Sequence, residues 1–223
     1  MAGRPRSVRN VIVFGLMPQV LFIVASTRAP LPLEWFYAIL FLILTAQVFY
    51  FERDNPGVRA VDTRQYKVAQ AKPQLIAGAS VGVVLGLPSV IWGEPSIGTS
   101  LLSDIVTQAI FVSFVETYYL IVFIETLSLG KLYVVLLWVA VFGFLHVRTD
   151  VLAGVGDLTT VLRFTYAATF GALFWLLYAG RTLFPKPRNK YFGGVTSWTA
   201  HFILNMIVIA FQLTLWGLVM FPV

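Results

Sequence analysis

The stretch EWFYAILFLILTAQVFYF, residues 34–51, decides the fold class because it carries no charge after its first residue. A helix needs about 20 mostly apolar residues to cross a bilayer, with a range of about 17–25. The whole chain has a similar character, since 58% of its 223 residues are hydrophobic and 12% are charged. Soluble domains average about 45–50% apolar and about 25% charged residues. The sequence therefore predicts a protein embedded in a membrane.

Seven stretches have the length and composition of a membrane span. They are Asn10–Ser26, Glu34–Phe51, Leu75–Gly93, Ile105–Glu125, Lys131–Val147, Val161–Gly180 and Val195–Phe221. We predict an all-α membrane bundle of about seven helices, within a range of about six to eight. The connections are too short for a second domain, so residues 1–223 are expected to form one. Because Pro18 and Gln19 interrupt the first apolar run, we expect it to be a retained span rather than a signal peptide.

Basic residues cluster at alternate ends of these spans. The clusters are Arg4, Arg6 and Arg9; Arg53, Arg59, Arg64, Lys67 and Lys72; and Arg181, Lys186, Arg188 and Lys190. Cytoplasmic connections carry an excess of Lys and Arg, so the pattern predicts a cytoplasmic N-terminus in a multi-pass protein of the plasma membrane. The polar stretch 52–74 is the candidate surface for anionic lipid or a membrane protein partner. The basic residues form no tract of their own, so nucleic acid is not an expected partner.

Few ionisable residues lie inside the spans, and each costs at least about 2.5–3.5 kcal/mol on insertion scales. They are Glu116, Glu125, His146, Arg163 and His201. Glu125 is interpreted as an interfacial carboxylate. His201 and Asn205 are four residues apart and share a helix face, as do Phe142 and His146. A carboxylate, two imidazoles and a carboxamide are sufficient groups for hydrolysis by an activated water.

These motifs resemble the CPBP (Abi) family of CAAX prenyl endopeptidases and bacteriocin-processing membrane proteins. The family pattern is Glu-Glu-x-x-x-Arg, then Phe-x-x-x-His, then His-x-x-x-Asn. The second and third motifs are intact as Phe142–His146 and His201–Asn205, and the similarity covers about residues 105–210. In the first motif Glu116 matches, whereas Thr117 replaces the second Glu and Ile121 replaces the Arg.

The resemblance implies a glutamic-type intramembrane endopeptidase that acts on a peptide or a lipidated protein. Glu116 and His146 would activate a water, and His201 with Asn205 would hold the oxyanion of the tetrahedral intermediate. No cofactor or metal is expected. We expect the missing Glu and Arg to remove support around the catalytic groups, and a site that is 1 Å looser loses about 100-fold in rate.

Three alternatives stay open at this point. In the first, zinc is bound by Glu116, His146 and His201 with one open position. In the second, the chain is an inactive relative with a structural, scaffold or immunity role. In the third it is a transporter, since glycine and proline interrupt its spans. His146 and His201 fall at different depths in the predicted spans, so we also expect Arg148–Thr160 to fold back into the protein.

Overall fold

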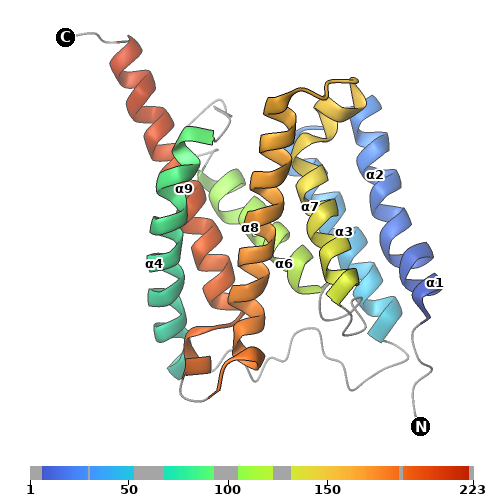
Figure 1. Ribbon diagram of the computed structural model, residues 1–223, viewed down its shortest axis with the longest axis horizontal. Helices are drawn as coiled ribbons and strands as arrows, with labels where there is room; N and C mark the ends of the chain where they lie inside the picture. Colours follow the sequence, from blue (N-terminus) through green and yellow to red (C-terminus); the bar gives the residue numbers. More distant parts are fainter. Residues whose placement is uncertain are drawn as a thin grey trace. The chain divides into compact units, whose positions relative to one another are not determined.

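The computed structural model describes residues 7–29, 31–52, 68–92, 105–122, 132–185 and 188–220. The helices, in chain order, are α1 (Val8–Asn10), the π-helix η1 (Val11–Leu16), α2 (Met17–Arg28), α3 (Leu33–Glu52), α4 (Val68–Trp92), the π-helix η3 (Ile105–Val112), α6 (Ser113–Val122), α7 (Leu132–Leu152), α8 (Leu158–Leu183), the 3₁₀-helix η5 (Arg188–Tyr191) and α9 (Gly194–Met220). The described residues of each of the seven predicted spans are helical, and the described ranges contain no strand (Figure 1). The predicted all-α fold is confirmed.

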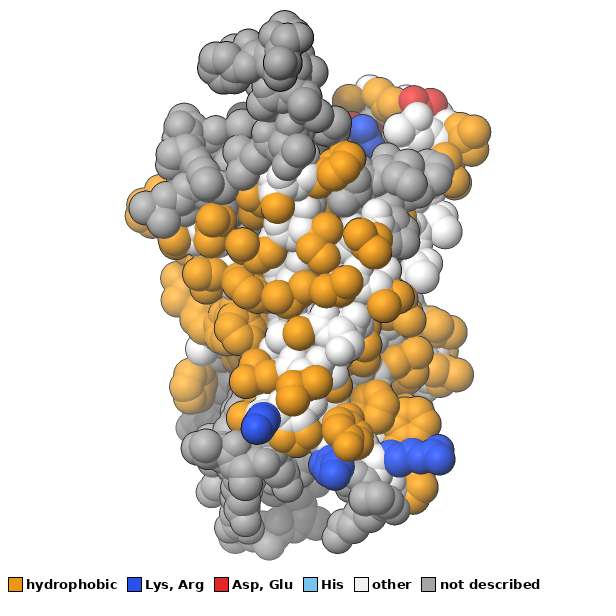
Figure 2. Space-filling view, turned by 90° about the vertical axis from the view of Figure 1, so that its left-hand side faces the viewer, with side chains coloured by type: hydrophobic (Ala, Val, Ile, Leu, Met, Phe, Trp, Pro, Cys, Tyr) orange, Lys and Arg blue, Asp and Glu red, His pale blue; other side chains and the backbone are white. Residues whose placement is uncertain are grey.

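Four stretches of helix in the described part of the chain are long and apolar enough to cross a bilayer. They are Val8–Arg28, Glu34–Phe51, Leu158–Gly180 and Gly194–Phe211, and shorter apolar helical stretches cover Ala71–Leu87, Ile105–Tyr118 and Val135–Val147. Many large apolar side chains are exposed, and hydrophobic side chains cover much of the face drawn in Figure 2. Apolar surface of this extent is unfavourable in water and suits a hydrocarbon environment. The chain is therefore a multi-pass helical membrane protein.

Two helix boundaries differ from the predictions. Helix α4 begins at Val68 rather than Leu75, so the end of the polar stretch 52–74 is helical, while residues 53–67 lie outside the described residues. Helix α7 continues to Leu152 rather than ending at Val147. The interpretation of Glu125 as an interfacial carboxylate falls outside the described residues. Residues 148–152 contain no glycine or proline that would end α7 with the apolar run, whereas α4 stays helical on both sides of Pro73.

The prediction that Arg148–Thr160 folds back into the protein is wrong. Residues 148–152 complete α7, residues 153–157 form a short turn, and α8 begins at Leu158. Gly154 has φ +77° in this turn, a conformation that glycine adopts without steric cost. Asp157 caps α8 by accepting hydrogen bonds from the backbone N–H and the hydroxyl of Thr160, at 2.8 and 2.9 Å. The two helices thus connect directly as a helical hairpin.

The chain forms two compact units. Unit 1 comprises Met1–Asp62 and Tyr118–Trp175, and unit 2 comprises Thr63–Thr117 and Leu176–Val223. In unit 1, α2 packs against α3 and α7. Its core includes Ile23, Leu40 and Leu44, each of which is completely buried. Near the end of α7, Asp150 forms an ion pair with Arg163 of α8 at 3.1 Å. Arg163, one of the ionisable residues predicted to lie inside the spans, thus has a partner.

Unit 2 is built on close packing of α4 against α9. Gly78, Gly82 and Gly86 recur every fourth residue on α4, and each is buried. A Cβ atom added at Gly82 would lie 2.7 Å from the carbonyl oxygen of Ala200, and one at Gly78 would lie 2.6 Å from that of Thr196. Membrane helices use small residues in this spacing because no hydrophobic force brings them together in lipid and van der Waals contact must do so. This contact fixes the part of α9 that carries His201.

Candidate functional site

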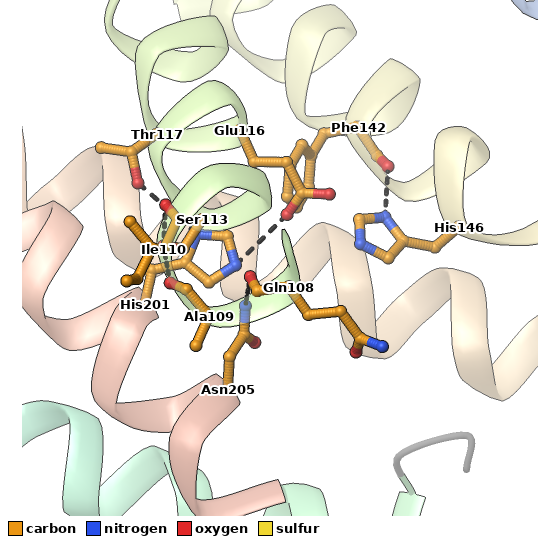
Figure 3. A network of polar contacts seen from close by, with 10 residues as sticks. All are labelled: Gln108, Ala109, Ile110, Ser113, Glu116, Thr117, Phe142, His146, His201 and Asn205. Carbon is orange, nitrogen blue, oxygen red and sulfur yellow. Dashed lines mark hydrogen bonds and ion pairs between the residues drawn. The ribbon is translucent and has the colours of Figure 1, made fainter. Parts of the chain in front are cut away.

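Glu116 and His201 form a buried pair within unit 2. Glu116 lies in the first turn of α6 and His201 in the third turn of α9, and their exposed fractions are 2% and 5%. His201 Nε2 lies 3.2 Å from Glu116 Oε2, within ion-pair and hydrogen-bond distance (Figure 3). Buried ionisable groups in a membrane protein are costly unless they are partnered, and such pairs mark functional sites. The structure therefore brings together Glu116 and His201, two of the four predicted catalytic residues.

The π-helix η3 precedes α6 and determines where Glu116 points. A π-helix adds an extra residue to the turn and thereby rotates the residues that follow, and such segments are frequent at functional sites. At the junction, the Ser113 hydroxyl donates to the carbonyl of Ala109, and it also lies 3.2 Å from that of Ile110. Ser113 is completely buried, and its single hydroxyl donor lies against the carbonyls at this junction. The junction thus sets the register in which Glu116 faces α9.

Thr117 contacts the opposite side of the His201 ring. Its hydroxyl oxygen lies 3.4 Å from His201 Nδ1, and the side chain is 3% exposed (Figure 3). The imidazole is therefore held at both nitrogens by consecutive residues of α6. We expected the loss of a glutamate at position 117 to remove support around the catalytic groups; the structure shows that the hydroxyl at this position contacts the histidine. The side chain of Ile121, the other departure from the family pattern, is not among those described.

Asn205 lies one turn after His201 on α9, as its spacing predicts. Its side-chain Nδ2 donates a hydrogen bond to the backbone carbonyl of Gln108 in η3 at 3.1 Å. Both polar residues of the third motif thus face the η3–α6 segment, which confirms their shared helix face. Ser197, one turn before His201, is also buried at 1% exposed. The carboxamide NH₂ has two hydrogens, and this bond uses one of them.

His146 belongs to unit 1, where it lies in α7. Its Nδ1 lies 2.9 Å from the carbonyl oxygen of Phe142, and the two rings have centroids 4.8 Å apart with a tilt of 57° (Figure 3). The predicted pairing of these two side chains is confirmed. Phe142 is buried at 2% exposed, whereas His146 is exposed. Because a carbonyl accepts only, this contact places a hydrogen on Nδ1 and leaves Nε2 as the acceptor of a neutral ring.

Metal ligation was the first alternative suggested by the sequence. Zinc sites of the catalytic type use three protein ligands and leave a position for water. Within the described part of the chain, no group of three or more His, Asp or Glu side chains lies close enough together to hold a metal ion. The Glu116–His201 pair supplies two side chains that could serve as ligands.

Sequence reasoning identified Glu116, His201 and Asn205 but missed the contacts made by Thr117 and Gln108. No sequence motif indicated η3, in which the backbone carbonyl of Gln108 accepts the hydrogen bond from Asn205. Comparison of the chain with protein-family models, with curated proteins and with solved structures finds no match.

Proposed function

We propose that this protein is an intramembrane endopeptidase of the glutamic type, as the resemblance to CAAX prenyl endopeptidases implies. The observation that carries the proposal is the buried Glu116–His201 pair, with 3.2 Å between Oε2 and Nε2. The described residues of unit 2 include no other Asp or Glu. An acidic side chain held against an imidazole in an apolar bundle is a general-base arrangement, and packing between apolar helices does not require it.

In this mechanism a water molecule enters between Glu116 and His201 and replaces their direct contact. Glu116 accepts a proton from the water, whose oxygen forms a bond with the carbonyl carbon of the scissile peptide. The electron pair of the carbonyl double bond moves to its oxygen, and the resulting oxyanion is stabilised by His201 and by the second hydrogen of the Asn205 amide. The C–N bond then breaks, and Glu116 passes its proton to the leaving amine. His146 has the role of an additional base toward the water, as the family pattern implies.

The test uses the full chain in phospholipid vesicles with a fluorogenic peptide that ends in a farnesylated CAAX sequence. We expect cleavage by the natural protein, with the cut bond identified by mass spectrometry. Glu116→Gln and His146→Ala should abolish it, because each removes a group that activates the water. Glu34→Gln is the matched control, since Glu34 is an exposed carboxylate in the first turn of α3. Full cleavage by folded Glu116→Gln would overturn the proposal.

A second candidate is an inactive relative in which the polar cluster joins helices. The observation that favours it is the hydrogen bond from Asn205 to Gln108, because this bond ties α9 to η3 and commits one amide hydrogen to structure. Interhelical hydrogen bonds in membranes contribute about 0.6 kcal/mol on average, so a structural cluster is reasonable. In that case the natural protein would not cleave the peptide, and Glu116→Gln would leave its cellular role intact.

The proposed setting is the plasma membrane, where the peptide or lipidated substrate and anionic lipid would meet the protein. Lys72, at the end of the polar stretch 52–74, is exposed on α4. Basic residues near a membrane surface attract anionic headgroups by about 1 kcal/mol each. Localisation of a tagged chain by cell fractionation tests this assignment.

A further inference from the structure

Thr117 behaves differently from other threonines in the helices of this protein. Thr45, Thr165 and Thr169 each donate their hydroxyl to the backbone carbonyl four residues earlier, at 2.8, 2.8 and 2.7 Å. This local bond is common for threonine in a helix because it needs no other element. The Thr117 hydroxyl instead lies 3.4 Å from Nδ1 of His201 on α9. A buried hydroxyl directed at a ring nitrogen on another helix serves that ring.

The identity of the two partners determines where the hydrogens lie. A carboxylate accepts hydrogen bonds and donates none, so Glu116 at 3.2 Å calls for a hydrogen on Nε2 of His201. In a neutral imidazole Nδ1 is then an acceptor and needs a donor. The Thr117 hydroxyl is a donor at that nitrogen. The consistent arrangement is therefore a chain from the Thr117 hydroxyl to Nδ1, and from Nε2–H to Glu116.

We propose that Thr117 is a positioning residue that holds His201 as its Nε2–H tautomer by donating a hydrogen bond to Nδ1. The inference rests on the proposed function only for its catalytic consequence, because the tautomer is a property of the resting protein. Groups that bond to the far nitrogen of a functional histidine fix both its ring orientation and its tautomer. Here the departure from the family pattern at position 117 retains a hydrogen-bonding group at the histidine.

The test is ¹⁵N and ¹³C NMR of the full chain in lipid, with both histidine rings labelled. The chain has two histidines, and His146→Gln assigns the signals. We expect His201 to carry its hydrogen on Nε2. His146 is expected to carry its hydrogen on Nδ1, because that nitrogen faces the Phe142 carbonyl. The two histidines should thus show opposite tautomers in one sample. A hydrogen on Nδ1 of His201 in the natural protein would overturn the proposal without any variant.

Two variants test whether Thr117 is responsible. Thr117→Val keeps the shape but removes the donor, so the Nδ1 signal of His201 should shift to the position of an unbonded nitrogen, while Thr117→Ser should keep the natural signal. Thr169→Val is the matched control, because its hydroxyl bonds locally to Thr165. Unchanged His146 signals report an intact unit 1, to which His146 belongs, and an unchanged midpoint of thermal unfolding reports the rest of the fold. His201 signals in Thr117→Val identical to those of the natural protein would contradict the proposal.

The cleavage assay separates this inference from the proposed function. Loss of the group that orients a metal-bound histidine costs about 10-fold to 100-fold in metal affinity or activity; taking that range as a guide, we expect Thr117→Val to lose about 10-fold to 100-fold and Thr117→Ser to restore activity. If the natural protein shows the Nε2–H tautomer but cleaves no peptide, the proposed function fails and the role of Thr117 stands. If it cleaves the peptide and Thr117→Val retains full activity with unchanged His201 signals, the role of Thr117 fails alone.

Discussion

The side chain of Gln47 donates hydrogen bonds to two backbone carbonyls of the helical turn that precedes Pro18. Proline has no N–H, so the backbone lacks one donor here. Gln47 Nε2, from α3, donates to the carbonyl of Phe14 at 3.0 Å and to that of Gly15 at 2.8 Å. Its own Oε1 accepts from Gln19 Nε2 at 2.7 Å. In a membrane, a neighbouring helix thus supplies side-chain donors to backbone carbonyls near a proline, where the helix itself has one donor fewer.

Gln47→Leu should destabilise unit 1 by about 1–3 kcal/mol, because it leaves buried carbonyls and the Gln19 amide without a partner. Reversible unfolding in mixed micelles measures the loss. Pro18→Ala restores a backbone N–H, so the cost of Gln47→Leu should be smaller in that background. Equal costs in the two backgrounds would show that Gln47 does not compensate for the proline.

Gly82→Ala should weaken the packing of α4 against α9. The added Cβ would lie 2.7 Å from both the Ala200 carbonyl oxygen and Ile203 Cβ, so one helix must move. Overpacking of this kind costs about 1–3 kcal/mol, measured as a lower midpoint of thermal unfolding. Gly156→Ala is the matched control, since a Cβ there meets nothing within 4 Å. Equal midpoints for the two variants would contradict the close approach.

Much of the fold was predictable because lipid imposes strong constraints on sequence. Apolar length located the seven predicted spans, whose described residues are helical, since backbone groups in hydrocarbon must find their partners within the protein. The spacing of Gly78, Gly82 and Gly86 carried a further signal, the small-residue pattern of packed membrane helices, that sequence reasoning did not use. This pattern marks the face of α4 that packs closely against a neighbouring helix, which in the structure is α9.

The site was predictable only in part. His201 and Asn205 were placed on one face by helical spacing, and ionisable residues in apolar spans are few enough to stand out. The contacts of Thr117 and Asn205 depend on η3, and a π-helix changes the register of a helix without a sequence signature. The extension of α7 to Leu152 was missed for a different reason. Apolar composition reports membrane depth, whereas a helix ends where its capping residues stop it.

Acidification should remove the stabilising effect of the Asp157 cap on α8. The backbone N–H of Thr160, followed by the Thr160 hydroxyl and the charge of Arg163, lowers the pKa of Asp157 from its ordinary value of 3.8. A carboxylate with a lowered pKa in the folded state stabilises the protein above the unfolded pKa, and the contribution disappears as pH falls through the folded pKa. The predicted window therefore lies below pH 3.8.

The measurement is the unfolding midpoint of the natural protein and of Asp157→Asn as a function of pH. Asparagine keeps an acceptor for the cap but carries no charge. The natural protein should be the more stable of the two at neutral pH, and the difference should shrink in acid. Glu34→Gln controls for the loss of an exposed carboxylate at the start of another helix. A difference that grows on acidification would contradict the assigned direction.

Glu116 and His201 should be energetically coupled in a double-mutant cycle. Glu116→Gln and His201→Gln each remove one partner of a buried contact, so each variant should lower the free energy of unfolding. The double variant should lose less than the sum of the two, because the second substitution removes a group that the first has already left unpaired. Reversible unfolding in mixed micelles gives the four free energies.

The size of the coupling indicates whether the contact is charge-assisted. A hydrogen bond to a charged group contributes about 1.5–3 kcal/mol, whereas interhelical hydrogen bonds in membranes average about 0.6 kcal/mol. We expect the larger range, because the Oε2–Nε2 contact of 3.2 Å is shielded from solvent and the Thr117 hydroxyl orients the ring from the other side. Thr117→Val should accordingly reduce the coupling, since a ring held at one nitrogen presents Nε2–H to Glu116 less favourably. A coupling at or below the membrane average would instead mean that the pair is an ordinary packing contact between α6 and α9.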